Sequence, residues 1–215
     1  YNNIFRSEVT RFYLGMMLVC SLVVGLSLYF ADIYPGLLTA LRHASFQVVS
    51  VVTTTGFATA DSNVWTPLAI IVLIFGSLVC ACAGSTSGGI KANRMLLAFK
   101  MMRTRLRQQQ HPNAVLRIKM DGVIQENEVL HLVSLFIVTY LAFLLAGTVF
   151  STLFGVDLMT SFSASMASMG NVGPGFGQVG SMSNYAGLPA VVKFSNTFLM
   201  LLGRLETVSY THLRA

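Results

Sequence analysis

The sequence predicts an all-α integral membrane protein built from two tandem repeats, each with a transmembrane helix, a short helix that re-enters the membrane, and a second transmembrane helix. Hydrophobic residues make up 54% of the 215 residues and charged residues only 10%, and the mean hydropathy is +0.67, which is typical of a chain that lies in lipid. Apolar runs long enough to cross a membrane alternate with shorter ones. Both short runs end in glycine-containing tips, where Gly56 and Gly173 are 117 residues apart.

The first repeat is expected over residues 12–99, after a charged cytoplasmic lead-in at residues 1–11. Residues 12–31 form an apolar run of twenty residues, which suits a helix that crosses ~30 Å of hydrocarbon. Residues 37–52 follow an external turn and are too few to cross. We therefore expect them to form a half-helix that enters the membrane from outside and stops within it.

The tip after this half-helix is predicted to line a pore, because non-helical backbone at membrane depth is tolerated only where protein buries it or water lines it. Its carbonyl groups and threonine hydroxyls could replace the hydration shell of an ion. The negative C-terminal end of the half-helix favours a cation. Val and Thr also favour strands, so a β-rich segment with a Thr-Gly turn is the alternative for this stretch alone. The tip consists of Thr53, Thr54, Thr55, Gly56 and Phe57.

The second span of this repeat, residues 65–99, is interrupted by glycines and hydroxyl residues. Such a stretch cannot be a stable lipid-facing helix, so we expect a flexible gate that lines a cavity. An ordinary cytoplasmic turn is the alternative. A Walker A loop is excluded, because Ile90 separates Gly89 from Lys91. The predicted gate consists of Gly84, Ser85, Thr86, Ser87, Gly88 and Gly89.

The connection at residues 100–127 is expected to be a basic cytoplasmic loop. Eight of the fourteen Lys and Arg residues lie between positions 91 and 119, and the positive-inside rule places such a segment in the cytoplasm. The same charges could dock a cytosolic partner or anionic lipid. Nucleic acid is not an expected partner, because these residues lack the interleaved aromatic side chains of a base-stacking surface.

Residues 128–206 are expected to form the second repeat in the same order. Residues 129–150 form a span, residues 158–169 a half-helix, and residues 188–206 a last span. Two equivalent tips on one side of the membrane predict a pseudo-symmetric pore, and acids near the outer turns, Asp32, Asp61 and Asp157, would attract cations. The second tip consists of Gly170, Asn171, Val172, Gly173 and Pro174.

Arg204 lies within the last span, where an arginine is costly and usually faces a partner or water. With a bend at Gly203, it could reach the interruption of the first repeat or the permeation path. Snorkelling to the inner surface is the alternative. Beyond Glu206 the sequence becomes polar and aperiodic, so residues 207–215 are expected to be a non-native or truncated end.

The cysteines and histidines do not predict a covalent or metal framework. Cys20, Cys80 and Cys82 lie within apolar runs and are expected to pack as small residues. The four histidines are scattered and lack metal-ligand spacing. The sequence has no intramembrane carboxylate pair, no Ser/His pairing and no H-E-x-x-H motif, so no enzyme is expected.

Four stretches together resemble the membrane subunit of the Trk/Ktr/HKT potassium-uptake superfamily, and are most similar to its bacterial TrkH type. They are VVSVVTTTGFATAD at residues 48–61, CAGSTSGGIK at residues 82–91, GNVGPGFG at residues 170–177 and MLLGRLE at residues 200–206. Members of this family carry four repeats of helix, pore loop and helix around one pore. The chain resembles the third and fourth of them.

The resemblance implies potassium uptake across the bacterial cytoplasmic membrane. It implies a selectivity filter at residues 53–57 and 170–174, and a gate at residues 84–89 that Arg204 partners. Ion-coordinating carbonyl groups, and hence K+, would lie at Thr54, Thr55, Asn171 and Val172.

Further partners are also implied by the resemblance. They are the first and second repeats of the same protein, a second copy in a homodimer, a TrkA-like cytosolic nucleotide-binding regulatory subunit, and membrane lipid. K+ is expected as the transported ion, with no cofactor in this chain. A sodium-dependent or sodium-permeable Ktr/HKT-like transporter is the alternative within transport, and a non-transporting membrane scaffold is the alternative outside it.

Overall fold

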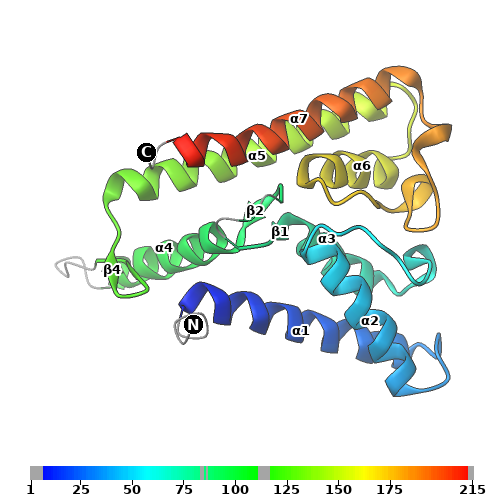
Figure 1. The fold of residues 1–215 in the computed structure, drawn as a ribbon, viewed down its shortest axis with the longest axis horizontal. Helices are drawn as coiled ribbons and strands as arrows, with labels where there is room; N and C mark the ends of the chain where they lie inside the picture. Colours follow the sequence, from blue (N-terminus) through cyan, green and yellow to red (C-terminus); the bar gives the residue numbers. More distant parts are fainter. Residues whose placement is uncertain (1–6, 83–84, 86, 111–116, 213–215) are drawn as a thin grey trace.

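The computed structural model describes residues 7–82, 85, 87–110 and 117–212, and this part of the chain is mostly helical. Two of its helices are long and apolar enough to cross a membrane, namely α1 (Glu8–Phe30) and α5 (Asn127–Leu153). Each begins one of two consecutive groups of helices (Figure 1). These groups correspond in order to the two predicted repeats.

Helices α1 and α2 (Leu37–Val52) pack tightly against each other. α2 has the bounds expected for the first half-helix, whereas α1 begins at Glu8 rather than at residue 12. A Cβ at Gly25 on α1 would overlap the side chain of Leu41, so glycine allows the two helices to approach. Their shared core consists of Val24, Leu28, Ala40, Ala44, Val48 and Val52.

The second span of the first group is broken earlier than the sequence predicts. Helix α3 (Pro67–Leu78) ends before the apolar run does. Strand β1 (Val79–Cys80) then pairs in parallel with β2 (Ile90–Lys91), and α4 (Ala92–Gln110) follows. Ala81 has a φ of 45°, a left-handed conformation that cannot continue the helix. The interruption therefore covers residues 79–91.

The predicted cytoplasmic loop is helical in its first part, because α4 continues to Gln110 through residues of good helix propensity. Strands β3 (Lys119–Met120) and β4 (Val123–Ile124) form a hairpin before α5. Its turn residues, Asp121 and Gly122, have φ values of 48° and 82°, as a tight hairpin turn requires.

The second group contains α5, α6 (Leu158–Gly170), two short 3-10 helices, η3 (Gly177–Val179) and η4 (Tyr185–Gly187), and α7 (Ala190–His212). Helix α7 is continuous through Gly203, where a bend is expected, and the helix extends over residues 207–212. A Cβ at Gly203 would overlap the carbonyl oxygen of Met169. Glycine at this position allows close packing of α7 on α6.

The two groups meet around the interruption, which lies near the centre of the molecule in Figure 1. Helix α3 packs on α6, and α4 packs on both α1 and α5. Figure 1 also shows the start of α1, the β3–β4 hairpin and the end of α7 at one end of the molecule, with the 3-10 helices at the opposite end. Each half-helix therefore points its C-terminus toward the middle of the molecule.

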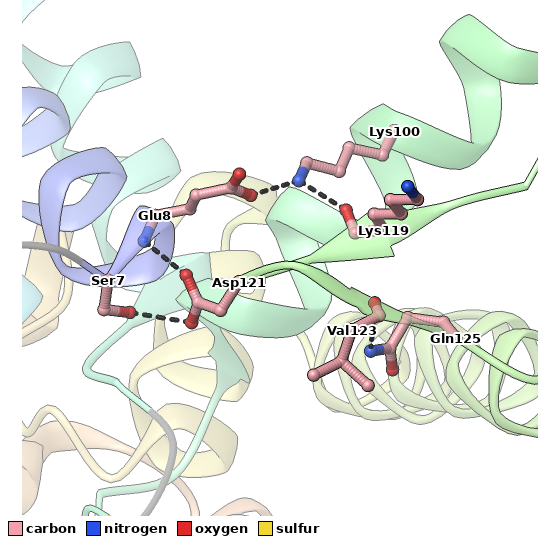
Figure 2. Close-up of polar contacts among 7 residues, drawn as sticks. All are labelled: Ser7, Glu8, Lys100, Lys119, Asp121, Val123 and Gln125. Atoms are coloured by element: carbon pink, nitrogen blue, oxygen red, sulfur yellow. Dashed lines mark hydrogen bonds and ion pairs between the residues drawn. The ribbon is translucent and has the colours of Figure 1, made fainter.

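The β3–β4 hairpin caps the N-terminus of α1, although the two are far apart in the sequence (Figure 2). The Asp121 carboxylate accepts hydrogen bonds from the Ser7 hydroxyl at 2.9 Å and from the Glu8 N–H at 2.6 Å. Lys100 on α4 pairs with the Glu8 carboxylate and donates to the Lys119 carbonyl at 2.7 Å. Because a helix N-terminus favours an anion, this contact stabilises α1 and joins it to the connection between the two groups.

Replacing Asp121 by alanine is expected to weaken the first turn of α1 by about 1 kcal/mol, the usual cost of a lost cap. Amide hydrogen exchange in that turn should quicken roughly fivefold in the full-length protein, as measured by mass spectrometry. Glu126→Ala is the matched control, because the Glu126 side chain on the same connection makes no capping hydrogen bond. Unchanged exchange in Asp121→Ala would contradict the capping role.

Candidate functional site

The chain passes from α2 into the first tip through residues with a left-handed backbone conformation. Thr54 has a φ of 55° and Gly56 a φ of 77°. The N–H groups of Thr54 and Thr55 still donate to the last turn of α2, to the carbonyls of Val51 and Ser50 at 3.1 and 2.8 Å. A non-glycine residue in this conformation costs on the order of 1–3 kcal/mol and is found most often at functional sites.

The tip after α6 has the same conformation 117 residues later. Asn171 has a φ of 53° and Gly173 a φ of 104°. The N–H of Asn171 donates to the Ser168 carbonyl at 3.1 Å, and that of Val172 to the Ala167 carbonyl at 2.9 Å. Both tips therefore share the same hydrogen bonds at equivalent positions, although their sequences share only the glycine.

The two tips contact each other. Gly56 lies so close to the Val172 carbonyl oxygen that a Cβ would overlap it, and the same Cβ would lie 3.3 Å from Cδ of Pro174. Val172 is buried, whereas the Phe57 side chain is 70% exposed. The structure therefore brings the two predicted filter segments, residues 53–57 and 170–174, together at the C-terminal ends of two half-helices.

Several backbone carbonyls of the tips are available as ligands. The Thr53 hydroxyl donates to the Val49 carbonyl at 2.7 Å and lies 2.8 Å from the Thr55 hydroxyl, while the Phe57 carbonyl accepts from the Ser50 hydroxyl at 2.6 Å. A backbone carbonyl without a hydrogen-bond donor can coordinate a cation. The negative C-terminal ends of the half-helices also favour a cation at this place. Among the residues that the structure describes, no donor pairs with the carbonyls of Thr54, Thr55, Asn171 and Val172.

A set of hydrogen bonds outside the tips, here called the outer clamp, joins the two groups of helices. The Asn63 amide donates to the Gly177 carbonyl at 3.1 Å and accepts from the Gly177 N–H at 2.9 Å. The Ser62 N–H donates to the Ser181 hydroxyl at 3.0 Å, and that hydroxyl donates to the Ala60 carbonyl at 3.1 Å. Because these residues follow the tips, the outer clamp fixes the tips relative to each other.

The interruption at residues 79–91 contacts the inner ends of both half-helices. The Ala81 N–H donates to the carbonyl of Val52, the last residue of α2, at 3.1 Å. Gly88 packs against the end of α6, where a Cβ would lie only 2.8 Å from the Gly170 carbonyl oxygen. The interruption therefore holds the ends of the half-helices in place, in addition to the outer clamp.

Only part of the predicted gate lies within the described residues, since Gly84 and Thr86 fall outside them. The Ser85 and Ser87 hydroxyls lie 3.1 Å apart. Ser87, Gly88 and Gly89 are buried. Of these residues, Gly88 lies against the second tip, next to Gly170 and Asn171.

The side chain of Asn171 lies close to both helix α7 and the interruption. Its amide donates to the Met200 carbonyl on α7 at 3.3 Å. A Cβ at Gly88 or at Gly203 would lie 3.0 Å from the Asn171 amide nitrogen. Arg204 follows Gly203 on α7, and its side chain is exposed. The structure thus places the helix that carries Arg204 against the second tip, whose Asn171 side chain is also approached by Gly88 of the interruption.

Two of the three outer acids have local structural roles. Asp61 accepts from the Asn63 N–H at 2.9 Å at the start of η2 (Ser62–Val64). Asp157 accepts from the N–H groups of Met159 and Thr160 at 3.1 and 3.4 Å and caps α6. These two carboxylates accept hydrogen bonds from backbone N–H groups and so act as local caps.

Side-chain metal ligation is not supported by the described ranges, where no three His, Cys, Asp or Glu side chains gather as metal ligands would. The free cysteines Cys20 and Cys80 are buried, and Cys82 is half-buried. Ligands from backbone oxygen suit hard cations. Carbonyl coordination is therefore the chemistry that this site can offer.

Sequence reasoning missed the side chains that hold the tips in place. Ser50, Asn63 and Tyr185 each hydrogen-bond to a backbone group near a tip, the last of them to the Gly173 carbonyl at 2.9 Å. Asn63 and Tyr185 stand in polar or small-residue stretches without a recognisable motif, and Ser50 stands between valines of the first half-helix. The spacing of residues along the chain gives no signal for such contacts.

Known proteins with similar sequences are cation transporters. The model of the family described as "TrkH: Cation transport protein" matches residues 8–215. The chain is 35% identical over 201 residues to the Trk system potassium uptake protein TrkH of Salmonella typhimurium, covering 94% of this chain and 41% of that protein. Its identity to the Trk system potassium uptake protein TrkG of Escherichia coli is 32% over 201 residues, with the same shares of 94% and 41%.

A solved structure is similar over nearly the whole chain. The potassium transporter TrkH from Vibrio parahaemolyticus matches with a TM-score of 0.88 at 30% identity, covering 99% of this chain and 45% of that one. This match confirms the all-α membrane fold. The chain spans about two fifths of the length of the curated relatives it matches.

Asn63→Ala is expected to lower the stability of the full-length protein by roughly 1–3 kcal/mol, because the Gly177 N–H loses its partner and the Gly177 carbonyl keeps only its bond from the Gly180 N–H. Thermal unfolding in detergent would measure the loss as a lower melting temperature. Asn127→Ala, at an exposed position at the start of α5, is the control. If both variants had the same melting temperature as the unmodified protein, the outer clamp would not contribute to stability.

Proposed function

Since the chain belongs to the TrkH family of cation transport proteins, we propose that it supplies two of the four sides of a potassium-uptake pore. Residues 53–57 and 170–174 form two sides of the selectivity filter. The matching hydrogen bonds and left-handed residues of the two tips, which meet at Gly56 and Val172, carry this proposal. The relatives that it matches are named for potassium uptake.

The tips would replace the water around K+ with fixed carbonyl oxygens. A dehydrated cation at membrane depth needs such ligands, and unpaired carbonyls there need a partner. The proposed ligands are the backbone carbonyls of Thr54, Thr55, Asn171 and Val172. The helix dipoles of α2 and α6 add negative potential at the same point. Entry into a negatively charged cell would gain ~2.3 kcal/mol per charge per 100 mV.

The interruption and Arg204 form the gate in this proposal. Ser85, Ser87, Gly88 and Gly89 lie below the tips in a segment without helical structure. The neighbouring residue Gly203 and the interruption both approach Asn171, which supports a role for α7 in the same gate. Arg204 would place positive charge in or beside the cation path and so oppose flux when the gate is closed.

The complete transporter would contain further parts. The first and second repeats would supply the other two sides of the filter, which agrees with the 41% share of the relatives that this chain spans. We also propose a homodimer in the bacterial cytoplasmic membrane, contact with membrane lipid and a TrkA-like cytosolic nucleotide-binding subunit that opens the gate. K+ is the transported ion, and no cofactor or nucleic acid takes part.

Flux into liposomes that contain the full-length protein tests the filter. Wild type should carry Rb+, a stand-in for K+, in preference to Na+. Gly56→Ala should lower this preference about tenfold, the change that ~1.4 kcal/mol of differential coordination produces, because its Cβ meets the Val172 carbonyl and its φ is 77°. Gly15→Ala on α1 is the control, since a Cβ there meets nothing within 4 Å.

Two outcomes would contradict the filter assignment. If wild type carried Na+ as readily as Rb+, a sodium-permeable transporter would replace the proposed one. If Gly56→Ala kept the preference of wild type while folding normally, the tips would not select the ion. Absence of any flux from a correctly folded full-length protein would favour a scaffold.

Arg204→Ala in the full-length protein is expected to raise resting Rb+ flux without the cytosolic regulator, because a positive charge leaves the closed gate. The liposome flux assay measures this directly. Arg105→Ala, at an exposed position on α4, is the charge-matched control. Reduced flux in a folded Arg204→Ala protein would instead assign Arg204 a structural role.

A further inference from the structure

The loop between the second tip and α7 contains a turn built to hold one tyrosine. Tyr185 opens η4, whose N-terminus is capped by Asn184, which accepts from the Ala186 N–H at 2.9 Å. At the other side of this turn, Lys193 on α7 donates to the Ala186 carbonyl at 2.8 Å. The buried Leu188 follows, and its core cluster packs against Tyr185. An otherwise polar loop thus fixes the position of an aromatic ring.

The hydroxyl of this tyrosine reaches the second tip. It donates to the Gly173 carbonyl at 2.9 Å, and the side chain is half-buried. Burial raises the pKa of Tyr185 to about 12, although a hydrogen bond with Ser168 opposes the shift. The hydroxyl is protonated at neutral pH, as an ordinary phenol is, so it can donate to the carbonyl.

Gly173 needs such a contact more than its counterpart Gly56 does. Gly56 is confined by the Val172 carbonyl, whereas a Cβ on Gly173 would meet nothing within 4 Å. With a φ of 104°, Gly173 has a conformation that glycine adopts and leaves easily. The space beside the Gly173 α-carbon is therefore empty of described residues, and among those residues the Tyr185 hydroxyl is the hydrogen-bond donor to the Gly173 carbonyl.

The first tip has a different hydroxyl in a comparable place. There, the Ser50 hydroxyl of the half-helix donates to the Phe57 carbonyl at 2.6 Å. The position 117 residues later is Ala167, which has no hydroxyl. Each tip thus has one hydroxyl-to-carbonyl hydrogen bond at its outer end, from its own half-helix in the first tip and from the following loop in the second.

We propose that Tyr185 is a positioning residue for ion selectivity, whose hydroxyl holds the Gly173 carbonyl in the orientation that the second tip requires. Asn184 and Lys193 act one step further away by holding the turn that carries Tyr185. This inference rests on the proposed potassium pore. It makes the loop after the second tip part of the selectivity apparatus, in addition to the tip itself.

The test compares Rb+ and Na+ flux through the full-length protein in liposomes for wild type and Tyr185→Phe, which removes only the hydroxyl. The ratio of Rb+ to Na+ flux is expected to fall roughly fivefold, as the loss of one ordinary hydrogen bond implies. Tyr29→Phe is the matched control, because Tyr29 lies exposed on α1. Asn184→Ala, which keeps the hydroxyl but removes the cap of its turn, should give a smaller fall.

Selectivity separates this role from a general structural one, because a merely destabilised protein would lose flux of both ions in proportion. A selective wild type with an unchanged ratio in both Tyr185→Phe and Asn184→Ala would overturn the role of Tyr185 and leave the proposed pore standing. A wild type that does not distinguish the two ions would overturn the pore and this inference together, and would do so before any variant is compared.

Discussion

The architecture depends on the requirement that every backbone polar group at membrane depth has a partner. Helices α2 and α6 are too short to cross, and each stops in the middle of the molecule. Their last carbonyls and those of the tips face a region where lipid could not satisfy them. Left-handed residues, Thr54 and Asn171, turn the chain at this point. In the proposed pore, a bound cation would satisfy these carbonyls, and this role would account for the strained backbone at the tips.

The position of each tip would be poorly fixed if only its own half-helix contacted it. The outer clamp centred on Asn63 joins the return segments, and Ala81 and Gly88 contact the inner ends of the half-helices. The same segment that we propose as a gate is thus in contact with the last residue of α2, just before the first tip, and with the second tip itself. Movement of this segment and the geometry of the tips are therefore physically linked. At the end of the molecule away from the 3-10 helices, Asp121 of the hairpin caps the start of α1.

The sequence predicted the larger elements because their physical signals are local. Run lengths distinguish spans from half-helices, and α2 has the predicted bounds. The early end of α3 at Leu78 could not be predicted, because apolar residues continue to Cys82 and only tertiary hydrogen bonds of Ala81 favour the break. Glycine spacing predicted both tips. It could not reveal that Tyr185 reaches Gly173, since that contact depends on how a polar loop folds back.

The central claim is that the two tips together coordinate a dehydrated cation. Anomalous diffraction from crystals of the full-length protein grown in Rb+ tests it most directly, because it locates the ion without relying on transport. The account predicts Rb+ between the tips, within coordination distance of carbonyl oxygens from both Thr55 and Val172. Rb+ found only at the outer carboxylates, with no peak between the tips, would contradict it.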